Sequence, residues 1–317
     1  MLRRTVEFST PGTRLSVAQR QLVVERPDMP KATLPIEDLG VVIVDDIRAS
    51  YTQAVFVELL EAGATVMVTG RNHLPAGLML PLDAHHVQTE RHLAQIEAGA
   101  ALRKRLWQEL VRSKLRQQAH VLRRFADGDS GLAAMAARVR SGDPDNLEAQ
   151  AAQRYWPRLF GRDFRRDRAA PGWNALLNYG YAVLRAATAR AIVASGLIPS
   201  IGVFHRNRAN PFALADDLLE PYRPYVDWRV RLLAEESPDD PPTPDQRAAR
   251  AALLSLLNET VTVDGRRNPL LLAIQSGAAS LARALTGGER RLALPEGLPV
   301  APGPEDGDGE ACGEPSG

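Results

Sequence analysis

The sequence predicts an α+β protein: a β-rich N-terminal domain over residues 1–90, an all-α domain over 91–295 and a disordered acidic tail over 296–317. Three changes in composition carry this division. Short β-branched and apolar runs between Pro-Gly and Pro-Asp turns dominate the first part. Alanine and leucine at helical spacing dominate the second. Glycine, proline and acidic residues dominate the end, where little apolar surface is available to bury.

The N-terminal part contains the local pattern of a β-α-β crossover. Short strands are predicted at Arg4–Phe8 and Gln21–Glu25, and a stronger one at Leu39–Asp45. A helix from Ser50 to Leu60 and a strand at Thr65–Thr69 follow, an order that pairs the two flanking strands in parallel. We expect this part to form a homodimer, because its apolar strands are many for so small a core.

The helical part begins with a long helix over 101–125, in which apolar residues recur at helical spacing. Asp143–Asn146 is a helix start signal, which places Glu148 in a first helical turn. Pro171–Asn174 opens another helix, which ends near Gly196.

The remaining helices are interrupted by proline and by turns. Residues 211–234 are predicted to be helical, with a break around Pro221. Residues 235–247 form an acidic, proline-rich linker. Helix returns over 248–288, interrupted by the turn at Val263–Arg266.

Basic residues are concentrated locally, although the net charge is only +1. Residues 101–125 contain eight Lys or Arg and one acid, and residues 154–168 contain six Arg. Such a surface suits a polyanion better than the overall charge suggests. A solvated helix face is the alternative, and Arg223 has the further alternative of pairing with a nearby acid. The candidate DNA contacts are Arg103, Lys104, Arg112, Lys114, Arg116 and Arg223.

Cysteine content and hydropathy exclude several classes of protein. The single Cys312 lies in the polar tail, which excludes an intramolecular disulfide and a cysteine-based zinc site. No apolar run is long enough for a membrane span, and the N-terminus has no signal-peptide core. We therefore expect a cytoplasmic protein with no membrane partner.

Three separate stretches supply side chains that suit a divalent cation. They contribute Glu148, His205 and the pair Asp217 and Glu220, which are three residues apart and share one face of a helix. Carboxylate oxygens and an imidazole nitrogen are ligands for Mg²⁺ or Mn²⁺. With arginine-rich surroundings, they point to phosphodiester chemistry.

Each of these residues also has a purely structural interpretation. Glu148 complements a helix dipole in its first turn, and His205 is a hydrogen-bonded loop residue. Asp217 and Glu220 form a solvated acidic face, and Asp216 points to a different face from both. These alternatives remain open at the level of single residues.

Taken together, the motifs resemble the CRISPR-associated spacer-acquisition integrases, the first-numbered Cas proteins, and most closely their type II form. The resemblance covers residues from about 2 to 290, and the order and spacing of the motifs make it specific. Ala149 stands where the family usually has glycine. The stretches that carry the resemblance are Leu34–Val42, Asn146–Ala152 with Tyr155 and Trp156, Asn174–Tyr181, Gly196–Pro199, Gly202–His205 and Asp216–Pro224.

The resemblance implies that residues 1–90 are a dimerisation domain and residues 91–295 the catalytic domain, and it implies a site and a reaction. Glu148, His205 and Glu220 would hold the divalent ion, with Asp217 as an accessory acid. The protein would join the 3′-hydroxyl of a short DNA fragment to a phosphodiester at the edge of a CRISPR repeat. A general metal-dependent nuclease on branched DNA or RNA and a non-catalytic nucleic-acid scaffold are the alternatives.

The resemblance also implies partners. They are double-stranded DNA, a second copy of the chain paired through the β domain, and a dimer of the second-numbered Cas protein. The effector nuclease of type II systems is a further candidate.

Overall fold

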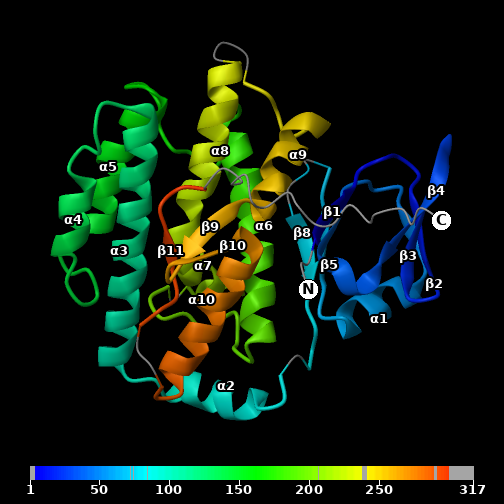
Figure 1. The fold of residues 1–317 in the computed structure, drawn as a ribbon, viewed down its shortest axis with the longest axis horizontal. Coiled ribbons are helices and arrows are strands. Elements are labelled where there is room, and N and C mark those ends of the chain that lie inside the picture. Colours follow the sequence, from blue (N-terminus) through cyan, green and yellow to red (C-terminus); the bar gives the residue numbers. More distant parts are fainter. Residues whose placement is uncertain are drawn as a thin grey trace, which may run out of the picture.

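The computed structural model describes residues 4–71, 73, 75–83, 85–205, 207–237, 241–288 and 291–299 (Figure 1). A smaller, β-rich N-terminal part lies beside a larger helical part, as predicted. The elements are β1 Arg4–Phe8, β2 Arg14–Ala18, β3 Gln21–Arg26, β4 Met29–Pro35, β5 Leu39–Val44, β6 Ser50–Tyr51, α1 Gln53–Glu61, β7 Thr65–Thr69, β8 Pro75–Met79, α2 Gln88–Glu97, α3 Ala100–Phe125, α4 Leu132–Arg138, α5 Leu147–Phe160, α6 Trp173–Ala194, α7 Ala213–Leu218, α8 Arg223–Glu236, α9 Arg247–Ser255, β9 Thr260–Val263, β10 Arg266–Pro269, α10 Leu270–Leu285 and β11 Pro295–Glu296, with 3-10 turns at η1 Ile36–Asp38, η2 Glu220–Tyr222 and η3 Leu256–Asn258.

The N-terminal part consists of two four-stranded sheets, ordered β1-β5-β7-β8 and β4-β3-β2-β6. Strand β5 pairs with β7 in parallel and α1 lies between them in the chain, so the predicted crossover is confirmed. The helix begins at Gln53 and not at Ser50. The reason is that Ser50 and Tyr51 extend beside β2 as the short strand β6.

Strand β5 is buried along its whole length, and its two faces serve two cores. Val42 and Val44 belong to the apolar cluster inside the N-terminal part. Val41 and Ile43 belong to the large cluster of the helical part. Alternate side chains of a strand point to opposite faces, so one sheet is shared between the cores and joins them.

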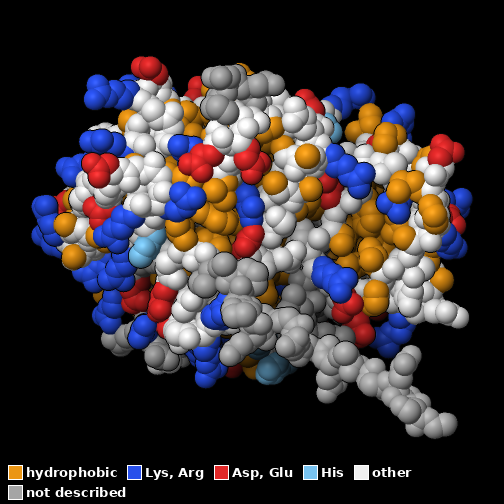
Figure 2. Space-filling model, turned by 45° about the horizontal axis from the view of Figure 1, so that its top comes forward, with side chains coloured by type: hydrophobic (Ala, Val, Ile, Leu, Met, Phe, Trp, Pro, Cys, Tyr) orange, Lys and Arg blue, Asp and Glu red, His pale blue; other side chains and the backbone are white. Residues whose placement is uncertain are grey.

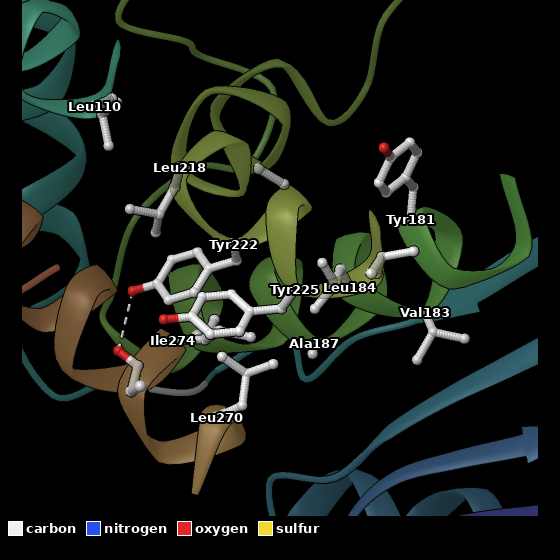
Figure 3. Close-up of a cluster of buried hydrophobic side chains, with 14 of the residues drawn as sticks. Leu110, Tyr181, Val183, Leu184, Ala187, Leu218, Tyr222, Tyr225, Leu270 and Ile274 are labelled. Carbon is white, nitrogen blue, oxygen red and sulfur yellow. Dashed lines mark hydrogen bonds between the residues drawn. The ribbon is translucent and has the colours of Figure 1, made fainter. Parts of the chain in front are cut away.

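The helical part packs α3, α6, α8 and α10 around one apolar core. Figure 3 shows Tyr222 and Tyr225 directed toward α10, where the Tyr222 hydroxyl donates to the carbonyl of Ala273 at 3.1 Å. Helices α6 and α8 approach closely at Gly180, where a β-carbon would lie 2.5 Å from a methyl group of Val226. This core fixes the positions of the helices that carry the candidate site.

One feature of this part differs from the predicted all-α domain. A three-stranded antiparallel sheet, β10-β9-β11, lies among the helices. Its hairpin turns where Val263–Arg266 predicted a turn, and alternate residues of β9 are buried. Pro157 lies within α5, which continues past it to Phe160. Of the predicted disordered tail, residues 300–317 lie outside the described residues. Its first residue, Glu296, is ordered in strand β11 and pairs with Thr262 of β9.

In the described part of the chain, no helix is both long enough and apolar enough to cross a membrane.

Candidate active site

The position of Glu148 is set by the start of α5. Both oxygens of the Asp143 carboxylate accept backbone N–H groups of this turn, from Leu147 at 2.9 Å and from Glu148 at 3.0 Å. These bonds satisfy donors that the first turn of a helix leaves unpaired. The predicted helix start is therefore confirmed, and it fixes the backbone from which the Glu148 side chain extends.

A lysine from α3 lies between two of the predicted site carboxylates. The ammonium nitrogen of Lys114 is 2.5 Å from Oε1 of Glu148 and 2.6 Å from Oε2 of Glu220. The other oxygen of Glu220 accepts from Nε of Arg223 at 2.8 Å. Glu148 and Glu220 thus share one positive charge, although they come from α5 and from η2.

The pKa values of these groups reflect the competition between burial and charge. Burial raises the pKa of Glu220, but the adjacent Arg223 and Lys114 outweigh it and lower that pKa to about 2. Burial lowers the pKa of Lys114, yet Glu220 and Glu148 outweigh it and the net shift is upward. Both carboxylates are therefore paired with a charged ammonium at neutral pH.

The second half of the site is the loop that carries His205. One oxygen of the Asp217 carboxylate accepts the backbone N–H groups of Val203 at 2.7 Å and Phe204 at 2.9 Å. The other oxygen accepts from the His205 backbone and lies 2.5 Å from its Nδ1. A β-carbon on Gly202 would lie 2.7 Å from the same carboxylate, so glycine is needed for this close approach.

Asp217 also sets the protonation of His205. The hydrogen bond to Asp217 raises the pKa of the imidazole, burial opposes this, and the charges of Asp217 and Glu220 add to the increase. A carboxylate can only accept, so Nδ1 carries a hydrogen. In the neutral imidazole the lone pair is then on Nε2, the arrangement in which a histidine binds a metal.

Asp217 and Glu220 do not face the same partner, although they are three residues apart. Helix α7 ends at Leu218, and Glu220 begins the 3-10 turn η2, whose tighter winding changes the direction of its side chain. Both carboxylates are buried, which contradicts a solvated acidic face. Asp216 points elsewhere, as expected, and pairs with Arg185 at 2.7 and 2.9 Å.

The donor set suits a hard divalent cation. Two carboxylate oxygens, Oε1 of Glu148 and Oε2 of Glu220, already converge on one positive charge, the Lys114 ammonium. Among the described residues, no group of three or more His, Cys, Asp or Glu side chains is gathered closely enough to hold a metal. The two glutamates therefore fit the ion, and the complete set of Glu148, His205 and Glu220 stays a prediction.

The predicted DNA contacts have different surroundings in the structure. Arg103 donates to the carbonyls of Ala98 at 2.9 Å and Gln95 at 3.1 Å, and Arg112 donates to that of Val139 at 3.1 Å. Lys104 and Arg116 are exposed. Lys114 and Arg223 are occupied by site carboxylates. Figure 2 shows Lys and Arg side chains concentrated over the side of the molecule that α3, α4 and α5 form.

Sequence reasoning missed two features of this region. Lys114 was one of many bases in α3, and no local signal distinguishes the one that points inward. Asp227 of α8 is buried and accepts hydrogen bonds from Tyr155, at 2.9 Å, and Tyr181. Burial raises its pKa to about 6, against the opposing effect of these two hydrogen bonds. The available signal in the sequence was an acid placed directly between the apolar residues Val226 and Trp228.

Comparisons with known proteins agree on one family. Residues 7–238 match the family described as CRISPR associated protein Cas1. A relative from Neisseria meningitidis serogroup C, named CRISPR-associated endonuclease Cas1, is 36% identical over 300 residues, covering 91% of this chain and 95% of its own.

Two solved structures share the fold. One is a casposase bound to an integration product, with a TM-score of 0.75, 20% identity and coverage of 91% of this chain and 92% of the other. The second is a complex of Cas6-RT-Cas1 with Cas2, with a TM-score of 0.69, 18% identity and coverage of 90% of this chain and 35% of the longer one.

Proposed function

Because this chain belongs to the Cas1 family of CRISPR-associated proteins, we propose that it is a divalent-metal-dependent DNA integrase and endonuclease of CRISPR adaptation. It joins short DNA fragments to the edge of a CRISPR repeat. The observation that carries the proposal is that the carboxylates of Glu148 and Glu220 converge on one positive charge, the Lys114 ammonium. Asp217 holds the histidine of the same site, His205.

The joining step is a transesterification. The 3′-hydroxyl oxygen of the fragment forms a bond to phosphorus, and the bond from phosphorus to the 3′-oxygen of the neighbouring repeat nucleotide breaks. The attacking hydroxyl loses one proton and the leaving oxygen gains one, so no further reactant is needed. Cleavage is the same step with water in place of the hydroxyl.

The side chains of the site have separate roles in this proposal. Glu148, Glu220 and Nε2 of His205 would hold Mg²⁺ or Mn²⁺, which stabilises developing negative charge on phosphate oxygens when bound. Asp217 keeps the imidazole oriented, with its proton on Nδ1. Arg223 fixes the Glu220 carboxylate through its other oxygen. Lys114 supplies positive charge to both glutamates when no metal is bound.

Two of the four proposed partners follow from the relatives. DNA is the proposed substrate, because the casposase that shares this fold is bound to an integration product. A Cas2 partner is suggested by the Cas6-RT-Cas1–Cas2 complex. A homodimer through the N-terminal part is supported by its exposed apolar residues, among them Ile47, Tyr51 and Val57. The type II effector nuclease is the fourth proposed partner.

The decisive experiment compares wild type with Glu148→Gln and His205→Ala in a strand-joining assay containing Mg²⁺ or Mn²⁺. We expect joining by wild type and its loss in both variants, with DNA binding largely retained. The control is Glu90→Gln, an exposed glutamate in α2. Near-normal joining by either site variant would refute the assignment. Cleavage without joining would make the protein a nuclease, and binding without either reaction would make it a scaffold.

A further inference from the structure

Phe204 is an exposed aromatic residue immediately before His205. It retains 46% of its accessible surface, whereas most large apolar side chains of the helical part are buried. Its ring stacks on Trp107 of α3, with centroids 4.2 Å apart and planes inclined by 1°. Trp107 is only 1% exposed. One face of the Phe204 ring is therefore covered by a rigid neighbour, and its remaining surface is open to solvent.

The position of this ring is coupled to that of His205. The rings of Phe204 and His205 meet edge to face at 5.6 Å, and His205 meets Trp107 in the same way at 5.7 Å. The Asp217 carboxylate that binds Nδ1 of His205 also accepts the backbone N–H of Phe204. The ring is thus held in place by contacts that also hold the candidate catalytic histidine.

The surroundings suit nucleic acid better than a second apolar protein surface. A groove of about 740 Å³ begins at His205, the residue after Phe204, and is lined by His205 together with Arg103, Asn207 and Arg208, while Phe204 itself lies outside this lining. Arginine and asparagine contact phosphate and sugar groups in protein–DNA interfaces. A nucleobase has an apolar face that stacks on an aromatic ring, while its own backbone remains within reach of such polar groups.

We propose that Phe204 is a stacking platform for the nucleobase next to the reacting phosphodiester or 3′-hydroxyl. This inference rests on the proposed function and adds a positioning residue to it. A base stacked on the open face would extend the order Trp107–Phe204–base. Ring–ring contacts span roughly 4.5–7 Å, so a base on this platform would lie one ring spacing from Phe204, whose backbone continues directly into His205. The platform acts on any base, because stacking is sequence-tolerant.

The test uses duplex DNA with 2-aminopurine, a fluorescent base, at the 3′-terminal nucleotide, bound to Glu148→Gln protein so that no product forms. We expect quenching of the fluorescence on binding. Adding Phe204→Leu, which keeps the apolar volume without the ring, should remove the quenching, and Phe204→Trp should retain it. In otherwise wild-type protein, Phe204→Leu should slow joining on the order of ten-fold, the effect of one lost base–aromatic contact.

The controls separate stacking from folding and from the proposed function. Leu93→Ala removes a comparably exposed apolar side chain from α2, 53% exposed in the structure, and it should leave quenching and joining unchanged. Thermal melts should match for all variants. Equal quenching and equal joining by Phe204→Leu and wild type would overturn the platform while the integrase proposal stands. Quenching that depends on Phe204, in a protein that never joins strands, would overturn the integrase proposal and keep the platform.

Discussion

At the scale of single residues, Lys114 determines how the site can exist without a metal. Glu220 is buried and Glu148 is half-buried, and two carboxylates so close together would repel each other without a cation between them. The Lys114 ammonium lies between them and offsets this repulsion. A divalent cation between the same oxygens would compete with this ammonium for one place.

This competition predicts the behaviour of Lys114→Met. Without metal, the variant should melt at a lower temperature than wild type, since removing one partner of a buried pair costs about 3–5 kcal/mol. On adding Mn²⁺, its melting temperature should rise more than that of wild type, because no ammonium has to be displaced. The measurement is a thermal melt with and without Mn²⁺.

Two further variants make the Lys114 experiment specific. Lys104→Met removes an exposed lysine of the same helix and should respond to Mn²⁺ as wild type does. Adding Glu148→Gln to Lys114→Met should remove the additional rise in melting temperature that Mn²⁺ produces. An equal Mn²⁺ effect in wild type and Lys114→Met would show that the ion does not bind between these glutamates.

Asp227 predicts a pH dependence of stability. Its pKa is raised by burial from 3.8 to about 6, so between these values the native state holds a proton that the unfolded state has released. The stabilisation is complete below pH 3.8 and is lost as pH rises through 6, amounting to at most about 3 kcal/mol. Compared with Asp227→Asn, wild type should therefore lose stability between pH 4 and pH 7. Urea unfolding of both proteins at pH 4 and pH 7 measures this. The prediction would be contradicted if wild type and Asp227→Asn differed in free energy of unfolding by the same amount at both pH values.

At the scale of elements, α3 has different roles on different faces. Arg105, Arg112, Arg116 and Arg123 recur at spacings of 7, 4 and 7 residues, which at 3.6 residues per turn places them on one face of the helix. Lys114 lies outside this stripe and points into the site. The same helix therefore supplies both a candidate phosphate-binding face and an internal positive charge.

The exposed arginines of this stripe should control the salt dependence of DNA binding. In the double variant Arg105→Gln, Arg116→Gln, the magnitude of the slope of log K against log salt should fall by about 1.8, which is about 0.9 for each lost phosphate contact. Unrelated duplex sequences should be affected equally. A salt titration of binding provides the measurement.

A matched pair of exposed arginines in the N-terminal part, Arg4→Gln with Arg14→Gln, is the control for this experiment. It removes the same charge and should change the slope less. An unchanged slope in the α3 variant, with normal melting, would place the DNA-binding surface elsewhere.

At the scale of the whole molecule, the two parts are joined by polar as well as apolar contacts. Arg250 of α9 is buried and pairs with Glu7 of β1 at 2.6 Å and with Asp45, at the end of β5, at 3.3 Å. The Tyr179 hydroxyl of α6 donates to Glu7 at 3.3 Å. With the shared sheet, these contacts fix how the N-terminal part sits against the helices.

The proposed homodimer predicts a mass of roughly twice the 34.6 kDa of one chain in sedimentation at micromolar concentration. Ile47 and Val57 are 61% and 43% exposed, so we expect Ile47→Asp with Val57→Asp to shift the protein toward monomer. Burial of two new carboxylates in an apolar interface is the physical reason. Leu93→Asp, at a 53% exposed site of α2, is the control and should leave the dimer intact. A monomeric wild type at all accessible concentrations would contradict the proposal.

Local sequence features were sufficient for much of the fold. The β5-α1-β7 crossover followed from apolar runs and turn residues that act within a few positions of one another. The start of α5 followed from Asp143, whose carboxylate bonds to the next turn. The family resemblance likewise depended on short motifs in a given order, and it identified Glu148, His205 and Glu220 as candidates.

The pairing of the site residues could not be obtained in this way. Lys114 reaches Glu148 and Glu220 because α3 packs against α5 and η2, an arrangement set by the apolar core and not by any neighbouring residue. Asp217 faces the His205 loop while Glu220 faces Lys114, because α7 ends at Leu218 and a 3-10 turn begins at Glu220. The strand β9 is stabilised by β11, which arrives from beyond α10. Each of these depends on contacts between distant segments, which become specific only when the whole chain is packed.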